Sequence, residues 1–317
     1  MLQNHFQYSS RSLAYARSGK FELALEDGKK IVELQPNWWE GYCRLGEAYK
    51  GLEKYEEAIV AYKRGLEFAP ENHFLYSNRS LAYACLGKFE LALEDAKKIV
   101  ELRPDWWEGY SRLGDAYKGL QRHEEAINAY KREIELDPEN HFLYSNRSLS
   151  YACLGKFELA LEDGKKIVEL RPDWWEGYCR LGEAYKGLEK YEEAIDAYKR
   201  GLEFDPENHF LYSNRSLSYA CLGKFELAVE DAKKIVELQP DWLEGYFRLG
   251  DAYKGLKKDK EAINAYTRRL EFNPRNTELG RNLGQQSIEN ESDAIKLVPE
   301  NHVLQSNQRS SNQVGLQ

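Results

Sequence analysis

The chain repeats itself every 68 residues. Residues 73–106 return at 141–174 with only two changes, Ala82 to Ser150 and Ala96 to Gly164. The other half of each 68-residue unit, for example residues 107–140, follows the same 34-residue template with different side chains. A segment this short cannot enclose a core by itself, so each repeat must bury its apolar face against the next one.

We predict eight tandem repeats over residues 5–276, alternating between a type with Ser at template position eight and a type with Gly there. The serine-type repeats span 5–38, 73–106, 141–174 and 209–242, and the glycine-type repeats span 39–72, 107–140, 175–208 and 243–276. After the array, we expect a capping helix at 277–298 and a degenerate, disordered tail at 299–317 that is rich in Asn, Gln and Ser.

Three template positions are the same in all eight repeats, and Tyr83, Ala92 and Pro104 represent them in repeat 73–106. The Ala lets two helices approach closely, the Tyr fills the space beside it, and the Pro ends the second helix. Apolar residues after the first turn recur at helical spacing. This pattern is identified as the tetratricopeptide repeat, which implies an all-α, right-handed superhelical solenoid of helix-turn-helix pairs.

The seven tryptophans lie at the joints between repeats, as in Trp38, Trp106 and Trp107. Two interpretations are open. The favoured one treats them as packing residues, and the other treats them as an exposed aromatic surface for a ligand.

Composition excludes several classes of function. The net charge is −8 and the basic residues are interleaved with Glu, so there is no basic stripe for nucleic acid. No apolar run is long enough for a membrane span, and the start of the chain has neither a basic nor an apolar signal region. The cysteines are odd in number, and Cys85, Cys153 and Cys221 are copies of one repeat position. We therefore expect a cytoplasmic protein without a disulfide framework.

No catalytic constellation stands apart from the repeat. His73, His141 and His209 recur at repeat starts, where we expect them in solvated first turns. The cysteines have no His at a fixed local spacing, and no glycine-rich phosphate motif is present. We therefore predict that the chain is not an enzyme and needs no metal or cofactor.

Residues 75–120, which begin LYSNRS and continue through PDWWEGYSRL, resemble the tetratricopeptide domains of the co-chaperone family that organises heat-shock chaperones. In that family, five positions in three consecutive repeats clamp the acidic C-terminal tail of a chaperone. Here two of the five are kept at each site: Asn78 with Arg112, Asn146 with Arg180, and Asn214 with Arg248. The other clamp positions hold Cys43, Glu47 and Glu108 at the first site, Ser111, Asp115 and Glu176 at the second, and Cys179, Glu183 and Glu244 at the third.

The resemblance thus implies a degraded clamp, with one Arg against two acids at each site. One contact between unit charges at about 4 Å contributes up to roughly 4 kcal/mol at an effective dielectric constant of about 20. Micromolar affinity amounts to only about 8 kcal/mol. We therefore expect acidic chaperone tails to bind poorly.

The retained residues have two interpretations. Arg112 is satisfied within its own helix by Glu108 and Asp115, at helical spacing. Alternatively, the same residues form a ladder that binds a neutral or basic peptide. In that case the adjacent serines, Ser77, Ser145 and Ser213, join the asparagines in bonding an extended backbone.

The leading hypothesis is a protein-protein interaction scaffold or co-chaperone-like adaptor. It would bind a polypeptide partner, such as a chaperone or a chaperone client, on the concave surface formed by the first helices. The alternative is a structural solenoid that self-associates head to tail, or a duplicated or engineered array without a selected ligand.

Overall fold

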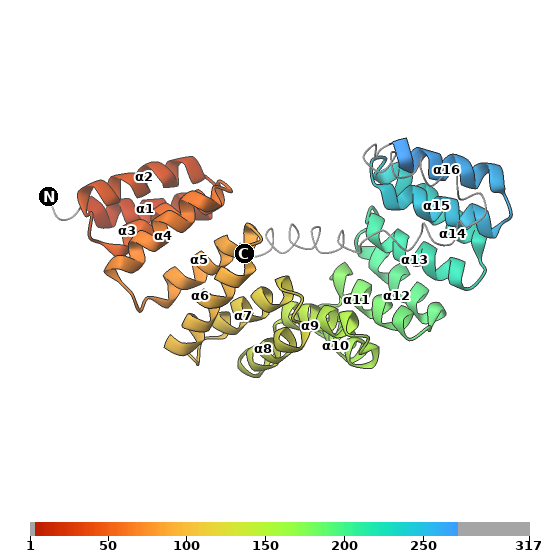
Figure 1. The fold of residues 1–317 in the computed structure, drawn as a ribbon, viewed down its shortest axis with the longest axis horizontal. Coiled ribbons are helices and arrows are strands. Elements are labelled where there is room, and N and C mark those ends of the chain that lie inside the picture. The colour runs from red at the N-terminus through yellow and green to blue at the C-terminus, as the bar shows by residue number, and fades with distance from the viewer. Residues whose placement is uncertain (1–3, 272–317) are drawn as a thin grey trace. The chain divides into compact units, whose positions relative to one another are not determined.

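The structure is a computed structural model that describes residues 4–271 of the 317-residue chain. All regular structure in this part is helical (Figure 1). The helices are α1 (Asn4–Arg17), α2 (Phe21–Leu34), α3 (Trp39–Gly51), α4 (Tyr55–Phe68), α5 (His73–Cys85), α6 (Phe89–Leu102), α7 (Trp107–Gly119), α8 (His123–Leu136), α9 (His141–Cys153), α10 (Phe157–Leu170), α11 (Trp175–Gly187), α12 (Tyr191–Phe204), α13 (His209–Cys221), α14 (Phe225–Leu238), α15 (Leu243–Gly255) and α16 (Asp259–Glu271). The predicted capping helix at 277–298 and the tail at 299–317 lie outside the described residues.

The described part divides into two compact units, with the boundary between Leu143 and Tyr144, inside α9. In unit 1, α1 to α8 form four helical hairpins, and the second helix of each hairpin packs on the first helix of the next. Unit 2 repeats this arrangement from α10 to α16. The prediction of an all-α solenoid of paired, stacked helices is confirmed.

The two helices of each serine-type hairpin meet at a small polar contact. The Ser80 hydroxyl of α5 donates to the backbone carbonyl of Ala92 in α6 at 2.9 Å, and both residues are buried. A bulkier residue at either position would push the two backbones apart. The same contact recurs in three other hairpins: Ser12 with Ala24, Ser148 with Ala160, and Ser216 with Ala228.

Glycine-type hairpins reach the same close approach differently. At Gly114 in α7, an added Cβ would lie 2.4 Å from the ring of Tyr130 in α8, which is completely buried. Tyr62 and Tyr198 occupy the same place against Gly46 and Gly182. The absence of a side chain on the first helix is therefore what makes room for the aromatic ring of the second.

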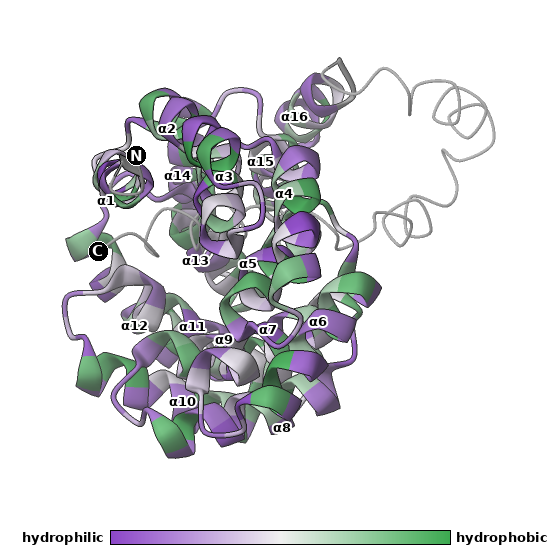
Figure 2. Ribbon diagram, turned by 90° about the vertical axis from the view of Figure 1, so that its left-hand side faces the viewer, coloured by the Kyte–Doolittle hydropathy of each residue, from purple (hydrophilic) through white to green (hydrophobic). Residues whose placement is uncertain are grey.

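Hairpins are joined where the second helices from α2 to α14 end, in each case two residues before the Pro of the repeat. The Tyr42 hydroxyl of α3 donates to the Pro36 carbonyl at 2.8 Å, which holds the turn against the next helix. One apolar cluster in unit 1 runs continuously from Cys43 of α3 to Ala116 of α7. Figure 2 shows that each helix carries both hydrophobic and hydrophilic residues, as this sharing of the core between neighbours requires.

The first hairpin differs from its copies on one face of α1. On α5, the corresponding face packs against α4, with Leu75 completely buried. On α1, polar residues take the places of apolar ones: Gln7 replaces Leu75, Arg17 replaces Cys85, and Ser18 replaces Leu86. All three polar side chains are exposed, so this end of unit 1 is polar.

The packing predicts opposite effects for two Gly-to-Ala substitutions in unit 2. Gly164→Ala should raise the urea midpoint, because Ala has a helix propensity better by about 1 kcal/mol. The added Cβ would lie 3.0 Å from the Leu181 backbone, which must shift by a few tenths of an ångström, and Ala96 and Ala232 hold the same position fully buried in other repeats. Gly182→Ala should lower the urea midpoint and reduce the free energy of unfolding by about 1–3 kcal/mol, because its Cβ would lie 2.4 Å from the ring of Tyr198. Far-UV circular dichroism measures both, and equal midpoints for the two variants would contradict this account.

Candidate functional site

The first helices of neighbouring hairpins lie side by side. Direct contacts join α1 to α3, α3 to α5 and α5 to α7 in unit 1, and α11 to α13 and α13 to α15 in unit 2. Template positions two, six, nine and twelve fall on one side of each first helix, because they are three or four residues apart. We call the surface formed by these positions the first-helix face. It holds the clamp positions at two, six and nine that the sequence comparison singled out.

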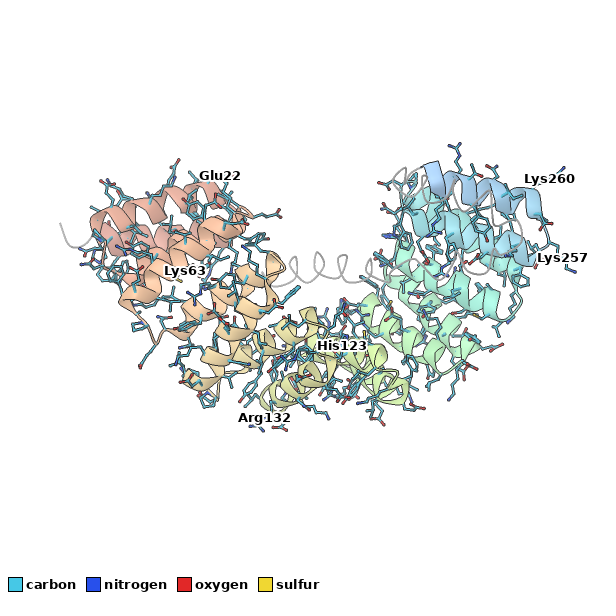
Figure 3. The ribbon with its side chains drawn as sticks, in the orientation of Figure 1. Glu22, Lys63, His123, Arg132, Lys257 and Lys260 are labelled. Carbon is cyan, nitrogen blue, oxygen red and sulfur yellow. The ribbon has the colours of Figure 1, made fainter. Side chains whose placement is uncertain are left out.

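The second helices carry charged side chains that point into solvent rather than toward a neighbouring hairpin. Figure 3 labels Glu22 on α2 and Arg132 on α8, both of which project away from the ribbon. Both side chains are exposed. The polar side chains that are half-buried and bonded to one another lie instead on the first helices, which form the candidate site.

In unit 1, Arg112 of α7 belongs to a network that bridges two hairpins. Its Nη2 donates to the Glu108 carboxylate at 2.8 Å, and its Nε donates to the Ser77 hydroxyl of α5 at 3.2 Å. Ser77 in turn donates to Glu108 at 2.8 Å. The three groups satisfy one another, so the arginine is a bonded link between α5 and α7 rather than a free charge.

Unit 2 contains the same network around Arg180 of α11. The guanidinium donates to Ser145, Glu176 and Glu183 at 3.2, 3.0 and 2.9 Å. Only 5% of the Arg180 side chain is exposed. A buried cation is tolerated only while its carboxylate and hydroxyl partners are all present. Removal of one partner should therefore reduce the free energy of unfolding.

Arg248 of α15 forms a third copy, with Glu244 at 2.7 Å and Ser213 of α13 at 3.4 Å. The predicted arginines and serines therefore meet across hairpin joints. Ser77, Ser145 and Ser213 are all buried. Their hydroxyls are engaged by the protein itself, which leaves the asparagines as the more accessible amides of the proposed ladder.

The asparagines have a partner that the sequence comparison missed. Lys50 of α3 donates from Nζ to the Asn78 Oδ1 of α5 at 2.9 Å, and Lys186 of α11 donates to Asn214 of α13 at 2.7 Å. Asn78 also donates to the carbonyl of Phe74 at 3.2 Å. The count of one arginine against two acids is thus incomplete, because a lysine joins the sites around Asn78 and Asn214. A sequence signal was present, since Lys occupies template position twelve in all four glycine-type repeats.

Asn146 is the third predicted amide, and it is half-buried on α9. Its backbone carbonyl accepts a hydrogen bond from the Ser150 hydroxyl at 3.0 Å. Ser150 stands where repeat 73–106 has Ala82, so this bond is absent from the otherwise near-identical repeat.

The predicted clamp positions hold side chains that the fold itself uses. Cys43 and Cys179 are buried, and burial raises the pKa of both thiols. Glu183 pairs with Arg180, and Glu47 pairs in the same way with Arg44, which also bonds Glu40. No free cation pair for a ligand carboxylate arises at these positions in the described sites.

Asp115 is an exception to the predicted pairing. It accepts a hydrogen bond from the buried Tyr130 hydroxyl at 3.0 Å and pairs with Lys118 at 3.3 Å. Asp is one methylene shorter than Glu at the same template position, so its carboxylate lies nearer the helix and meets Tyr130. Arg112 is therefore satisfied by Glu108 and Ser77 rather than by Glu108 and Asp115.

Glu133 of α8 is buried beside this site. It is completely inaccessible, and among the described residues neither carboxyl oxygen has a hydrogen-bond partner of good geometry. Burial and the nearby Asp115 carboxylate raise the pKa of Glu133 to about 9, although Ser111 and Arg112 offset part of the rise. Gly65 and Gly201 hold the same template position in two other glycine-type repeats, and Arg269 holds it in the fourth.

An aromatic cluster recurs at the start of the serine-type hairpins. The Phe74 ring lies 5.3 Å from Trp106 and 4.2 Å from His73, and Trp106 meets His73 edge-on at 4.8 Å. The packing interpretation holds for Trp106. The expectation of solvated histidines is wrong: His141 is buried, and His73 and His209 are half-buried, with burial lowering the pKa of both.

Within residues 4–271, no cluster of His, Cys, Asp and Glu could hold a metal ion. In the same part of the chain, no helix has the length and apolar character needed to cross a bilayer.

Comparison with known proteins agrees with the fold. Models of the tetratricopeptide repeat match residues 39–72, 107–140, 175–208 and 243–276. A wheat protein named Hsp70-Hsp90 organizing protein is 51% identical over 49 residues, which is 16% of this chain and 8% of that protein. Yeast heat shock protein STI1 from Saccharomyces cerevisiae is 47% identical over a segment of the same size. The match thus spans less than a tenth of the length of these curated relatives.

Two solved structures share the fold at low identity. A tetratricopeptide repeat protein from Parabacteroides merdae has a TM-score of 0.63 at 19% identity and covers 79% of this chain and 99% of that one. The Cut9 and Hcn1 hetero-tetramer of the APC/C also gives 0.63, at 17% identity, and covers 77% of this chain and 48% of that one. The chain is therefore a tetratricopeptide repeat protein that resembles the repeat domains of the heat-shock-chaperone organising proteins.

Glu133 generates a prediction about stability and pH. A carboxyl whose pKa is raised in the folded state contributes stability that is present at low pH and is lost as pH rises towards the folded pKa of about 9. Glu133→Gln should therefore stabilise the protein at pH 8, on the order of 3 kcal/mol, and much less at pH 5. Urea midpoints at the two pH values measure this, with the exposed Glu135→Gln on the same helix as the control. A gain that does not depend on pH would contradict a neutral buried carboxyl.

Proposed function

We propose that this tetratricopeptide repeat protein is an interaction scaffold that binds an extended polypeptide along its first-helix face, as a co-chaperone-like adaptor in the cytoplasm. The repeat architecture supports protein-protein interaction as the general role. The resemblance to chaperone-organising proteins over 49 residues supports a chaperone or chaperone client as the partner. No disulfide joins the five cysteines, all of which lie within residues 4–271, as a reducing compartment allows.

The contact between Lys50 and Asn78 is the observation that carries this proposal. It places the Lys50 ammonium group and the Asn78 amide of adjacent hairpins together on the first-helix face, where both side chains are half-buried and burial lowers the pKa of Lys50. The ammonium group has three N–H donors, of which Asn78 takes one. A peptide carbonyl is the natural acceptor for another, and Lys186 with Asn214 repeats the arrangement in unit 2.

Charge on the face favours a neutral or basic partner. Each arginine is already paired with a glutamate, so an acidic ligand would have to displace Glu108 or Glu244 from a bond of 2.7–2.8 Å. The ligand would also meet the displaced carboxylate. A peptide without clustered acids avoids this cost.

Acidic tails should therefore bind poorly, and substitutions that restore clamp residues in unit 1 should increase their affinity. A decapeptide with an acidic C-terminal half should show no binding in the low micromolar range. Glu47→Asn with Glu108→Lys restores two clamp residues, frees Arg112, and should raise the affinity about ten- to a hundredfold. Fluorescence anisotropy of the labelled peptide measures the change.

The control for this variant is Glu57→Asn with Glu94→Lys, which makes the same charge change at exposed positions on second helices. An equal gain in this control would show that net charge alone acts. Low-micromolar binding of the acidic peptide to the unmodified protein would disprove the loss of the clamp.

The proposal itself is tested with a random peptide library displayed on phage. Selection on the intact protein should enrich peptides poor in Asp and Glu. Asn78→Ala with Asn214→Ala should weaken their binding about tenfold, because each substitution removes an amide that orients a lysine. Asn128→Ala with Asn264→Ala, at exposed positions on α8 and α16, is the matched control. Selected peptides whose affinity is unchanged by the first pair would remove the first-helix face as the site.

The first hairpin weighs against the alternative of head-to-tail self-association. Stacking of a second copy on α1 would need the apolar face that α5 offers to α4. Gln7, Arg17 and Ser18 make that face polar instead, and their burial would cost free energy without compensating partners. Peptide binding is therefore the function we prefer.

A further inference from the structure

The first-helix face also carries exposed aromatic rings that neither the clamp comparison nor the core explains. Phe6 of α1 and Phe74 of α5 occupy template position two, and 60% and 51% of their surfaces are exposed. The helix between them, α3, has Glu40 at this position, and α7 has Glu108. Phenylalanine and glutamate thus alternate along the face in unit 1.

Phe74 lies on the same side of α5 as Asn78, because the two residues are four apart on one helix. The Asn78 amide donates to the carbonyl of Phe74, one turn away. At the same template position on α7, Glu108 bonds Arg112 and Ser77. The phenylalanine therefore belongs to the surface that holds the lysine and asparagine contact.

Each of these rings is held in place by its neighbours. Phe6 lies 5.3 Å from Trp38 and 4.1 Å from His5, which matches the arrangement around Phe74. Phe210 of α13 repeats it in unit 2, at 5.4 Å from Trp242 and 4.1 Å from His209. A ring fixed before binding loses little conformational freedom on contact with a ligand, which favours affinity.

Charges between the rings are balanced. On α3 and α7, the acids Glu40, Glu47, Glu108 and Asp115 accompany the bases Arg44, Lys50, Arg112 and Lys118. All four acids are paired with a base on their own helix. The unit 1 face is therefore neutral as well as partly aromatic.

We propose that the partner is an extended, non-acidic peptide that places two apolar side chains on alternate hairpins, one on Phe6 and one on Phe74, with a polar segment between them across α3. This inference rests on the proposed function and specifies its ligand. The polar segment crosses α3, which carries Glu40 at the level of the two rings, and ends beside Asn78, whose amide is a hydrogen-bond partner for the peptide backbone.

The spacing of the two apolar side chains follows from the packing. Neighbouring first helices in contact lie about 8–10 Å apart, so α1 and α5 are separated by roughly 16–20 Å. An extended chain advances about 3.3 Å per residue, which makes this distance about five or six residues. Side chains point to the same side of an extended chain at even separations, so the partner carries its apolar residues at i and i+6.

A set of fluorescein-labelled dodecapeptides of Ser, Asn and Lys tests this directly. Each peptide carries two Phe residues, separated by two to seven positions, and one peptide carries none. Anisotropy titrations should show the tightest binding for the i, i+6 peptide, at least tenfold tighter than the peptide without Phe. Equal affinity for all spacings, or for the peptide without Phe, overturns the proposal.

Variants then locate the contact. Phe6→Ala with Phe74→Ala should remove most of the gain from the two Phe residues, whereas Val60→Ala with Ile263→Ala, at exposed positions on α4 and α16, should leave it intact. Unchanged binding by the Phe variant overturns the inference.

The asparagine variants separate the two proposals. One outcome is that library-selected peptides lose affinity with Asn78→Ala and Asn214→Ala but keep it with the Phe variant. In that case the scaffold function stands, and Phe6 and Phe74 are excluded as contacts of the ligand. If the selected peptides are indifferent to both pairs, the proposed function itself fails.

Discussion

The close approach of two helices within each hairpin is the constraint on which the rest of the molecule depends. In serine-type hairpins a buried hydroxyl spans the gap to the opposite backbone, as Ser80 does to Ala92. In glycine-type hairpins a buried ring fills the gap, as that of Tyr130 does against Gly114. Both solutions set the orientation of the first helix, and that orientation brings template positions two, six and nine of successive hairpins onto one surface. A change in the helix separation would move every group of the candidate site.

The polar groups of that surface serve the fold before they serve a ligand. Arg112, Ser77 and Glu108 close a network between two hairpins, and Arg180 is so well enclosed that it behaves as part of the core. The arginines at the predicted clamp positions are therefore engaged in internal ion pairs. Beside them, the half-buried Lys50 and Asn78 are in contact, and the exposed Phe74 lies one turn away.

The fold could be predicted from the sequence alone, because the repeat allows few other arrangements. A 34-residue period with constant Tyr, Ala and Pro leaves little choice beyond stacked helical hairpins. The site was harder, since its contacts cross between hairpins. Lys50 reaches Asn78 over 28 residues, a pairing that no local spacing reveals. Position nine is Glu183 beside Arg180 but Asp115 beside Arg112. The longer Glu183 reaches its arginine, whereas the shorter Asp115 accepts a hydrogen bond from Tyr130 instead. The histidines were misjudged because the flanking Trp covers them.

The recurrence of the aromatic cluster in both units has a consequence for stoichiometry. Phe74 and Phe210 have matching ring neighbours, but Phe74 is exposed whereas Phe210 is half-buried, so the two places are not equally accessible to a ligand. A partner with a single recognition segment would therefore favour the ring in unit 1. A partner with two such segments would gain avidity only where the second segment also meets an accessible ring, at an effective concentration set by its own linker.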